Sequence, residues 1–387
     1  MSKIKLLIDT DAVADDIRAI SIALQHPDVE VVGITTVCGC VSVDQAVANI
    51  ARTLKANGKT NIPIYKGTSN PLIGNVDPEQ REKTFFGNDG LGDSPNEFPQ
   101  VSSDDWNAHV PNEHAATALV KIFEQDRDII LVCIGPLTNV ALALKLRPEF
   151  GSWPKKIVAM GGNFHAMGNI TANSTAEFNF GFDPEAAHIV LKEMKCKKIL
   201  VPWECFVHQS NKKTVDFHKH LLIDHSLAGF FELSTRRGRV ILESLGRQFS
   251  YCDEICIGVA IDPEGIIEEE KVIRGAVELQ GAFTRGQVAL GWIENLDKNC
   301  TKMAELNFVM SYDATVLGEY EFDLLNSTNT QRNASTFNSP NNKTPKMIKY
   351  SKRDCFRQTN PRHYSSLSEL QKRKTTSIMK LCRMTFY

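Results

Sequence analysis

The chain has 387 residues, 42% of them hydrophobic and 23% charged, so it can bury the core of one large domain or two ordinary ones. Its formal net charge of −2 is unevenly distributed, because residues 325–387 hold 13 of the 44 lysines and arginines but only 2 of the 46 acidic residues. The acidic remainder argues against nucleic acid as a partner, and no apolar run has the roughly 18–20 residues that a membrane helix needs.

The first 202 residues alternate between strand and helix patterns. Strands rich in β-branched and other apolar residues are predicted over residues 3–9, 29–37, 62–65, 128–133, 156–160 and 198–202. Helices are predicted between them over residues 15–25, 42–56, 113–123, 139–146 and 184–194. Such alternation is typical of an α/β, Rossmann-like fold with a mainly parallel central sheet and helices on both faces.

The second half of the chain is less regular. Residues 226–246 have a helical pattern, and the β-rich segments 271–283 and 287–292 are expected to form mixed edge strands of the same sheet. From Asn326 the composition becomes rich in Asn, Ser and Thr and then basic. We therefore predict a folded domain over residues 1–324 and a disordered tail over 325–387, with a short amphipathic helix near 366–381.

The ten cysteines bear on the redox environment. The first residues enter a strand directly, without the pattern of a secretory signal segment. Many cysteines in a long chain of this kind predict reduced thiols and a cytoplasmic location.

Four carboxylates lie within eight residues at the first junction between strand and helix: Asp9, Asp11, Asp15 and Asp16. Like charges crowded this closely repel each other unless a cation lies among them, and hard divalent cations prefer oxygen ligands. Asp9 and Asp11 should point the same way along a strand, whereas adjacent helical residues diverge by about 100°. One of Asp15 and Asp16 can therefore hold a metal while the other reaches a ligand. A helix cap followed by a solvated acidic turn is the structural alternative.

This run resembles the N-terminal signature of the inosine/uridine-preferring nucleoside hydrolases. Further blocks of that family follow in the same order, at residues 86–92, 135–139, 160–162, 168–169, 176–179 and 183–187. The resemblance spans about residues 3–320, and Val-Pro-Trp-Glu at 201–204 with Tyr-Cys-Asp at 251–253 is most similar to animal members. It implies calcium-dependent hydrolysis of the N-glycosidic bond of ribonucleosides such as inosine or uridine. It also implies a homo-oligomer, a dimer or a tetramer.

The resemblance assigns roles to residues of this chain. Asp11 would bind the metal and take the proton from water, and the remaining protein ligands would be Asp16, Asp253 and the main-chain carbonyl of Ile134. Asp9 would orient this shell from behind. The ribose hydroxyls and pocket walls would be contacted by Asp15, Met160, Asn169, Glu177, Phe178 and Asn179. The chemistry agrees, because cleavage through an oxocarbenium-like state needs a positioned water and nearby anions.

The chain departs from the family pattern near the site. Ala-Val at 12–13 replaces Pro-Gly, and Cys40 replaces an Asn that helps to orient water and sugar. Phe86 and Cys252 stand where many members have His, the second of which protonates the leaving base. A thiol is a poor hydrogen-bond donor, so the sequence does not identify the group that protonates the leaving base. Glu204 would serve if burial raised its pKa, and Cys252 is either the acid or a small packing residue.

Three alternatives to an active hydrolase remain at this point. A nucleoside- or ribose-binding pseudoenzyme with little turnover would explain the substitutions at Cys40, Phe86 and Cys252. A phosphatase of the haloacid-dehalogenase type shares only Asp-Thr-Asp at 9–11. A purely structural α/β domain would use the acids as helix caps. Nothing in these residues favours purine over pyrimidine nucleosides.

Overall fold

The computed structural model describes residues 2–75, 85–107, 113–170, 174–210, 215–293 and 302–327. Its centre is a nine-stranded sheet in the order β3-β2-β1-β4-β5-β6-β9-β7-β8. The strands are β1 Ile4–Thr10, β2 Val29–Thr36, β3 Ile64–Lys66, β4 Ile129–Cys133, β5 Lys156–Met160, β6 Lys197–Val201, β7 Ile267–Val277, β8 Val288–Leu290 and β9 Ala304–Tyr312. All neighbours from β3 to β9 are parallel, while β7 runs antiparallel to β9 and to β8. This confirms the mainly parallel sheet with a mixed edge.

The longer helices are α1 Ala14–Gln25, α2 Val43–Ala56, α4 Ala115–Gln125, α5 Thr138–Leu146, α7 Pro184–Glu193, α8 Trp203–Ser210, α9 Ser226–Ser244, α10 Asp253–Ile261 and α12 Ala314–Ser327. Short turns of helix are α3 Asp104–Asn107, α6 Phe178–Phe182 and α11 Pro263–Ile266, with 3-10 segments η1 Pro95–Glu97, η2 Pro148–Ser152 and η3 Lys219–Leu222. Among the described residues, no helix combines the length and hydrophobicity needed to cross a bilayer.

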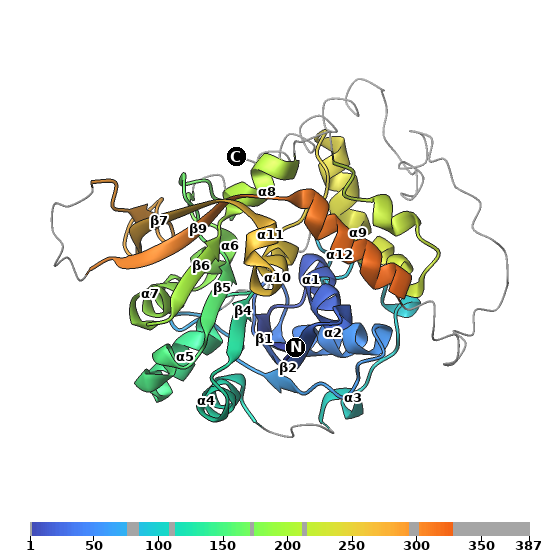
Figure 1. Ribbon diagram of the computed structural model, residues 1–387, viewed down its shortest axis with the longest axis horizontal. Helices are drawn as coiled ribbons and strands as arrows, with labels where there is room; N and C mark the ends of the chain where they lie inside the picture. The colour runs from blue at the N-terminus through green and yellow to red at the C-terminus, as the bar shows by residue number, and fades with distance from the viewer. Residues whose placement is uncertain are drawn as a thin grey trace, which may run out of the picture.

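Helices cover both faces of the sheet because its strands are apolar on both sides. Along β1, Leu6 and Ile8 belong to the core that packs under α1, α2 and α10, while Leu7 belongs to the core under α4, α5 and α7. This alternation follows from the two-residue period of a strand. Figure 1 shows α4, α5 and α7 together on one side of the sheet and α1 and α10 on the other.

The chain reverses its direction of travel across the sheet at β1. It proceeds outward from β1 to β2 and β3, and then returns to place β4 on the other side of β1. The loops after β1 and β4 therefore diverge and leave a crevice beyond the carboxyl ends of these strands, where open α/β sheets bind ligands. Asp11 and Ile134 follow the two strands directly, so the fold brings both to this crevice.

Several elements lie outside the sequence prediction, among them α8, α10, β9 and α12. Helix α10 has apolar residues on all sides and is buried almost throughout, so it lacks the one-sided period that marks a surface helix. Strand β9 comes last in the chain but lies between β6 and β7, so β7 joins the parallel strands only through it. Helix α12 continues to Ser327 and Leu325 is buried, so the first three residues of the tail predicted over 325–387 are helical and not disordered. The rest of that predicted tail, with the helix near 366–381, lies outside the described part of the chain.

Candidate active site

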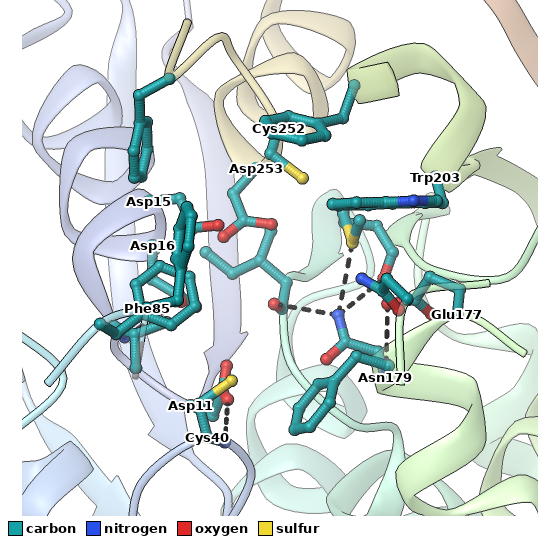
Figure 2. A pocket seen from close by; sticks show the side chains of 18 of the residues that line it. Asp11, Asp15, Asp16, Cys40, Phe85, Glu177, Asn179, Trp203, Cys252 and Asp253 are labelled. Carbon is teal, nitrogen blue, oxygen red and sulfur yellow. Dashed lines mark hydrogen bonds between the residues drawn. The ribbon is translucent and has the colours of Figure 1, made fainter. Parts of the chain in front are cut away.

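A cavity of about 180 Å³ occupies the crevice, far more than one water molecule needs. It is lined by Asp11, Val13, Asp15, Asp16, Cys40, Phe85, Phe86, Ile134, Met160, Asn169, Ile170, Glu177, Phe178, Asn179, Trp203, Phe206, Leu242, Phe249, Cys252 and Asp253. All but two of the predicted site residues are thus brought to one cavity. Figure 2 shows Asp11, Asp15 and Asp16 on one side of it and Trp203, with Glu177 and Asn179 nearby, on the other.

Asp11 and Asp16 of the first motif are held by hydrogen-bond donors from the turn before α1 and from the loop after β2. Strand β1 ends at Thr10, and α1 begins at Ala14. The Thr10 hydroxyl donates to one oxygen of Asp16, and the Val13 N–H donates to the other at 3.0 Å. Asp11 accepts the Cys40 N–H at 2.7 Å. Both carboxylates therefore have fixed orientations, and each oxygen keeps a lone pair for a further partner.

A further carboxylate reaches the cavity from α10. Asp253 lies in the first turn of this helix, behind Cys252 at the N-cap position. Ligand atoms of Asp15, Cys252 and Asp253 all lie within 4.8 Å of one another, and within the described residues they form the only group of three such side chains able to hold a metal. Of the predicted ligands, this tight group contains only Asp253. Asp15, expected to contact ribose, lies beside it (Figure 2).

Burial and mutual repulsion disfavour negative charge throughout this cluster. Burial raises the pKa of Asp11 to about 6, although hydrogen bonds from Cys40 oppose the rise. Burial raises the pKa of Asp15 to about 7, with repulsion from Glu254 and Asp11 adding to it. The pKa values of Asp16 and Asp253 also lie well above the usual range, for the same two reasons. Such a cluster is fully charged at neutral pH only where positive charge compensates it.

Two polar side chains from the segment after β5, Glu177 at the N-cap of α6 and Asn179 within it, form the floor of the cavity. Glu177 accepts N–H groups from Asn179 at 2.7 Å, Gly162 at 2.8 Å and Phe180 at 3.1 Å, yet burial still raises its pKa to about 7. The Asn179 amide donates to the main-chain oxygens of Ile134 at 3.3 Å and Met160 at 3.2 Å. These bonds hold Glu177 and Asn179 against the floor and leave the Asn179 carbonyl for other donors (Figure 2).

Two lining residues carry a buried oxygen without a hydrogen-bond partner in the described structure. They are Oδ1 of Asp15 and Oδ1 of Asn169. Buried acceptors are rarely left unpaired in native proteins. Because both residues line the cavity, these oxygens can accept hydrogen bonds from a ligand.

Aromatic side chains also line the cavity. Trp203 stacks on Phe206 with ring centroids 4.5 Å apart, and Phe85 stacks on Phe249 at 5.6 Å. Phe85 also meets Phe86 edge to face at 4.8 Å. Two stacked pairs from distant parts of the chain thus form apolar walls that suit a planar ring.

Asp9 and Glu204 are the predicted site residues that do not line the cavity. Asp9 is fully buried and accepts hydrogen bonds from Thr35 at 2.5 Å and Asn139 at 2.8 Å, so it ties β1 to β2 and α5 behind Asp11. Glu204 is 2% exposed and accepts the N–H groups of Phe164, His165 and Met167. Its carboxylate holds the loop after β5, and no contact with the cavity supports the predicted role as leaving-group acid.

The substituted positions have clear surroundings. Cys40 hydrogen-bonds Asp11 through its N–H and its thiol, so it occupies the orienting position beside the expected base. Cys252 is 5% exposed, and burial beside Asp253 raises the pKa of its thiol well above the usual range, so the thiol keeps its proton. Ala12, in the place of the family's Pro, has a φ of 59°, a backbone conformation that costs roughly 1–2 kcal/mol for a residue with a Cβ.

The predicted site residues did not include seven of the lining residues: Val13, Phe85, Ile170, Trp203, Phe206, Leu242 and Phe249. Phe85 precedes the Gly-Asn-Asp-Gly block and Phe249 lies shortly before Tyr251, so both adjoin segments that already carried a signal. Leu242 lies within the amphipathic helix α9 and carries no motif. Only the packing of α9 against the crevice reveals its role.

Together, the doubly wound fold and this cavity define an α/β protein that carries a cavity lined by carboxylates and aromatic rings at the switch point of its sheet. Comparison with known proteins identifies the family. The sequence model described as "Inosine-uridine preferring nucleoside hydrolase" matches residues 6–317, and the chain belongs to this family. Membership confirms the resemblance in the motifs and rules out the haloacid-dehalogenase interpretation.

Individual relatives agree. The chain is 39% identical to "Uridine nucleosidase 1" of Arabidopsis thaliana over 188 residues, 48% of this chain and 52% of that protein, so it spans about half the length of this plant relative. It is 28% identical to the "Inosine-uridine preferring nucleoside hydrolase" of Leishmania major over 302 residues, 76% of this chain and 90% of that protein. The solved "Inosine-Guanosine Nucleoside Hydrolase (IG-NH)" superimposes with a TM-score of 0.72 at 34% identity, covering 83% of this chain and 98% of that one. Calcium, the oligomeric state and the cytoplasmic location stay predictions.

Proposed function

We propose that this chain cleaves the C1′–N bond of ribonucleosides in a calcium-dependent reaction and releases ribose and the free base. The presence of carboxylate and amide oxygens together with aromatic rings in one cavity carries the proposal, because a nucleoside joins a hydroxyl-rich sugar to a planar base. Unpaired oxygens of Asp15 and Asn169 can accept hydrogen bonds from ribose hydroxyls. A sugar that lacks these hydroxyls would leave the two oxygens unsatisfied. The faces of Trp203 and Phe85 can stack on the base.

The buried carboxylates fit a hard divalent cation. Asp11, Asp16, Asp253 and the Ile134 carbonyl would hold it, and all of them are oxygen donors, which suits calcium. The raised pKa values of the carboxylates reflect burial and repulsion, and a cation would offset both. When bound, such an ion supplies positive charge that makes a nearby water more acidic.

The residues of the chain supply the remaining steps. Asp11, oriented by Cys40, accepts a proton as the water oxygen forms its bond to C1′. The electron pair of the C1′–N bond leaves with the base. The cavity carboxylates stabilise the positive charge that develops on the ribosyl ring. Glu177 and Asn179, fixed to the floor, hold the sugar hydroxyls.

The aromatic and aliphatic side chains of the cavity predict weak discrimination between bases. Among them are Phe85, Phe86, Trp203, Phe206, Leu242 and Phe249, whose side chains offer stacking surfaces and few polar atoms. Strong discrimination needs hydrogen bonds that the wrong base leaves unpaired. We therefore expect inosine and uridine to differ by about 200-fold or less in kcat/KM, since apolar contacts alone distinguish ligands by roughly 1–3 kcal/mol at most.

A second candidate function is nucleoside binding with little turnover. It is favoured by one observation: none of the described residues that line the cavity is a histidine, and the position of the family's acid is occupied by Cys252. Base departure would then lack an efficient proton donor.

Ribose release from inosine, uridine, adenosine and cytidine, with calcium and with chelator, separates the two functions. Calcium-dependent release that is lost in Asp11→Ala, but kept in Asp44→Ala, supports the hydrolase. Asp44 is the matched control because its carboxylate is 78% exposed and pairs with Lys66 on the surface. Calcium-dependent binding of nucleoside without release would support the binding protein instead.

A further inference from the structure

A buried cluster of charged side chains lies behind the cavity. Arg18 of α1, Glu254 of α10 and Glu321 of α12 are each at most 2% exposed. Arg18 Nε lies 3.0 Å from Glu254 Oε1, and Arg18 Nη2 lies 3.0 Å from Glu321 Oε1. The other Glu321 oxygen lies 2.9 Å from His220 Nδ1 and accepts the Tyr251 hydroxyl at 3.0 Å. Glu321 is therefore held from three sides, and it fixes Arg18 in turn.

The cluster touches the cavity wall at two points. Glu254 Oε2 accepts the N–H of Cys252 at 2.9 Å, next to Asp253. The Arg18 guanidinium lies over the Phe249 ring, 5.5 Å from its centroid, and Phe249 stacks on Phe85 inside the cavity. The wall segment of residues 249–253 is thus held at both ends by contacts that lead to Arg18.

Arg18 belongs to α1, the helix that carries Asp15 and Asp16 at its start. Arg18 follows Asp15 by one helical turn on α1, whereas Asp253 begins α10. Contacts of Arg18 with Glu254 and Phe249 therefore determine how the two acidic helix ends face each other. Glu321 contributes from beyond residue 317, where the match to the family ends.

Energetics favour a positional role over a stabilising one. Taking several charges out of water costs several kcal/mol per ion, and apolar side chains of similar volume often stabilise a core equally well. Cooperative networks of this kind do, however, hold their members in one arrangement. A site whose carboxylates must be held around a cation needs such an arrangement.

We propose that Arg18, held in place by Glu321, is a positioning residue that holds the wall segment 249–253 against α1 and so sets the spacing between Asp15 and Asp253. The expected effect on calcium affinity rests on the proposed function, whereas the role of Arg18 in holding residues 249–253 against α1 does not. This role requires all three helices, because the contacts of Arg18 join α1 to α10 and α12.

Glu321→Gln tests this role, because it keeps the shape of the side chain and removes its charge. We expect amide hydrogen exchange of residues 249–254 to become about tenfold faster or more, as expected when a fixed contact opens locally. Calorimetric titration of the chelator-treated protein should show a calcium Kd raised about 10–100-fold, the usual effect of losing a group that orients metal ligands. Leu144→Ala, in the core on the other face, is the control. It should lose stability without these local effects.

Arg18 variants complete the test. In an Arg18→Met background, Glu321→Gln should change neither the amide exchange of residues 249–254 nor the calcium Kd any further, because Glu321 acts through Arg18. Arg18→Lys, which keeps the charge, should recover part of the calcium affinity lost in Arg18→Met. Unchanged exchange in folded Glu321→Gln protein would overturn the inference. Wild-type protein that binds no calcium would instead refute the proposed function, and the exchange of residues 249–254 would still decide for or against the role of Arg18.

Discussion

Replacing Glu204 by Gln separates a structural role for this carboxylate from a catalytic one. Its two oxygens accept three backbone N–H groups, from Phe164 at 3.0 Å, His165 at 2.7 Å and Met167 at 3.3 Å. The Gln amide keeps one acceptor oxygen and turns its NH₂ group toward a backbone donor. Since a hydrogen bond to a charged group contributes roughly 1.5–3 kcal/mol, we expect unfolding to become easier by about 2–4 kcal/mol.

Urea unfolding measures this loss as a lower midpoint at unchanged slope. Glu243→Gln, at an exposed position of α9, is the matched control and should stay within about 0.5 kcal/mol of wild type. Because Glu204 does not line the cavity, the pH profile of ribose release should keep its shape. Wild-type stability together with a lost basic limb of that profile would refute this reasoning and make Glu204 the leaving-group acid.

Three further perturbations address the cavity and the buried cluster. Gly39→Ala should abolish ribose release, because the added Cβ would lie 2.2 Å from Asp11 Oδ2. Gly229→Ala, at a position with open space around it, should instead raise the free energy of unfolding by about 0.4–1 kcal/mol. Ribose-release assays and thermal unfolding of both variants check these two expectations. Trp203→Ala should lower kcat/KM about 10–100-fold through lost stacking, as ribose-release kinetics will show, and an unchanged value would place the base elsewhere. The pKa of Glu321 is lowered to about 2 by its neighbours His220 and Arg18, so its stabilisation is complete above its ordinary value of 4.5 and is lost as the pH falls toward 2. Glu321→Gln should flatten this acid limb in unfolding titrations, and a limb as steep as that of wild type would contradict the assignment.

Local patterns were sufficient for the elements that build the parallel part of the sheet. β1 and β2 are runs of apolar and β-branched residues, and the helices between strands show a one-sided period. Helix α10 escaped this reasoning because a helix buried on all sides has no polar face to mark its period.

For the candidate site, too, some features are visible in the local sequence and others only in the folded chain. The crowding of Asp11, Asp15 and Asp16 is local and visible in the chain, and it indicates a cation because like charges must be compensated. The interpretation of Glu204 depended on what its carboxylate faces. Only the folded chain shows that it faces three backbone donors of the neighbouring loop.

The sequence by itself determined the fold class, the family resemblance and most of the polar side chains of the cavity, since these depend on periodicity and on short motifs. Tertiary structure alone decided that Asp15, Cys252 and Asp253 converge within 4.8 Å, that Phe249 stacks on Phe85, and that Arg18 joins three helices behind them. The physical reason is that backbone preference and burial act on neighbours in the chain. Which distant surfaces meet depends on how all the helices pack on the sheet at once.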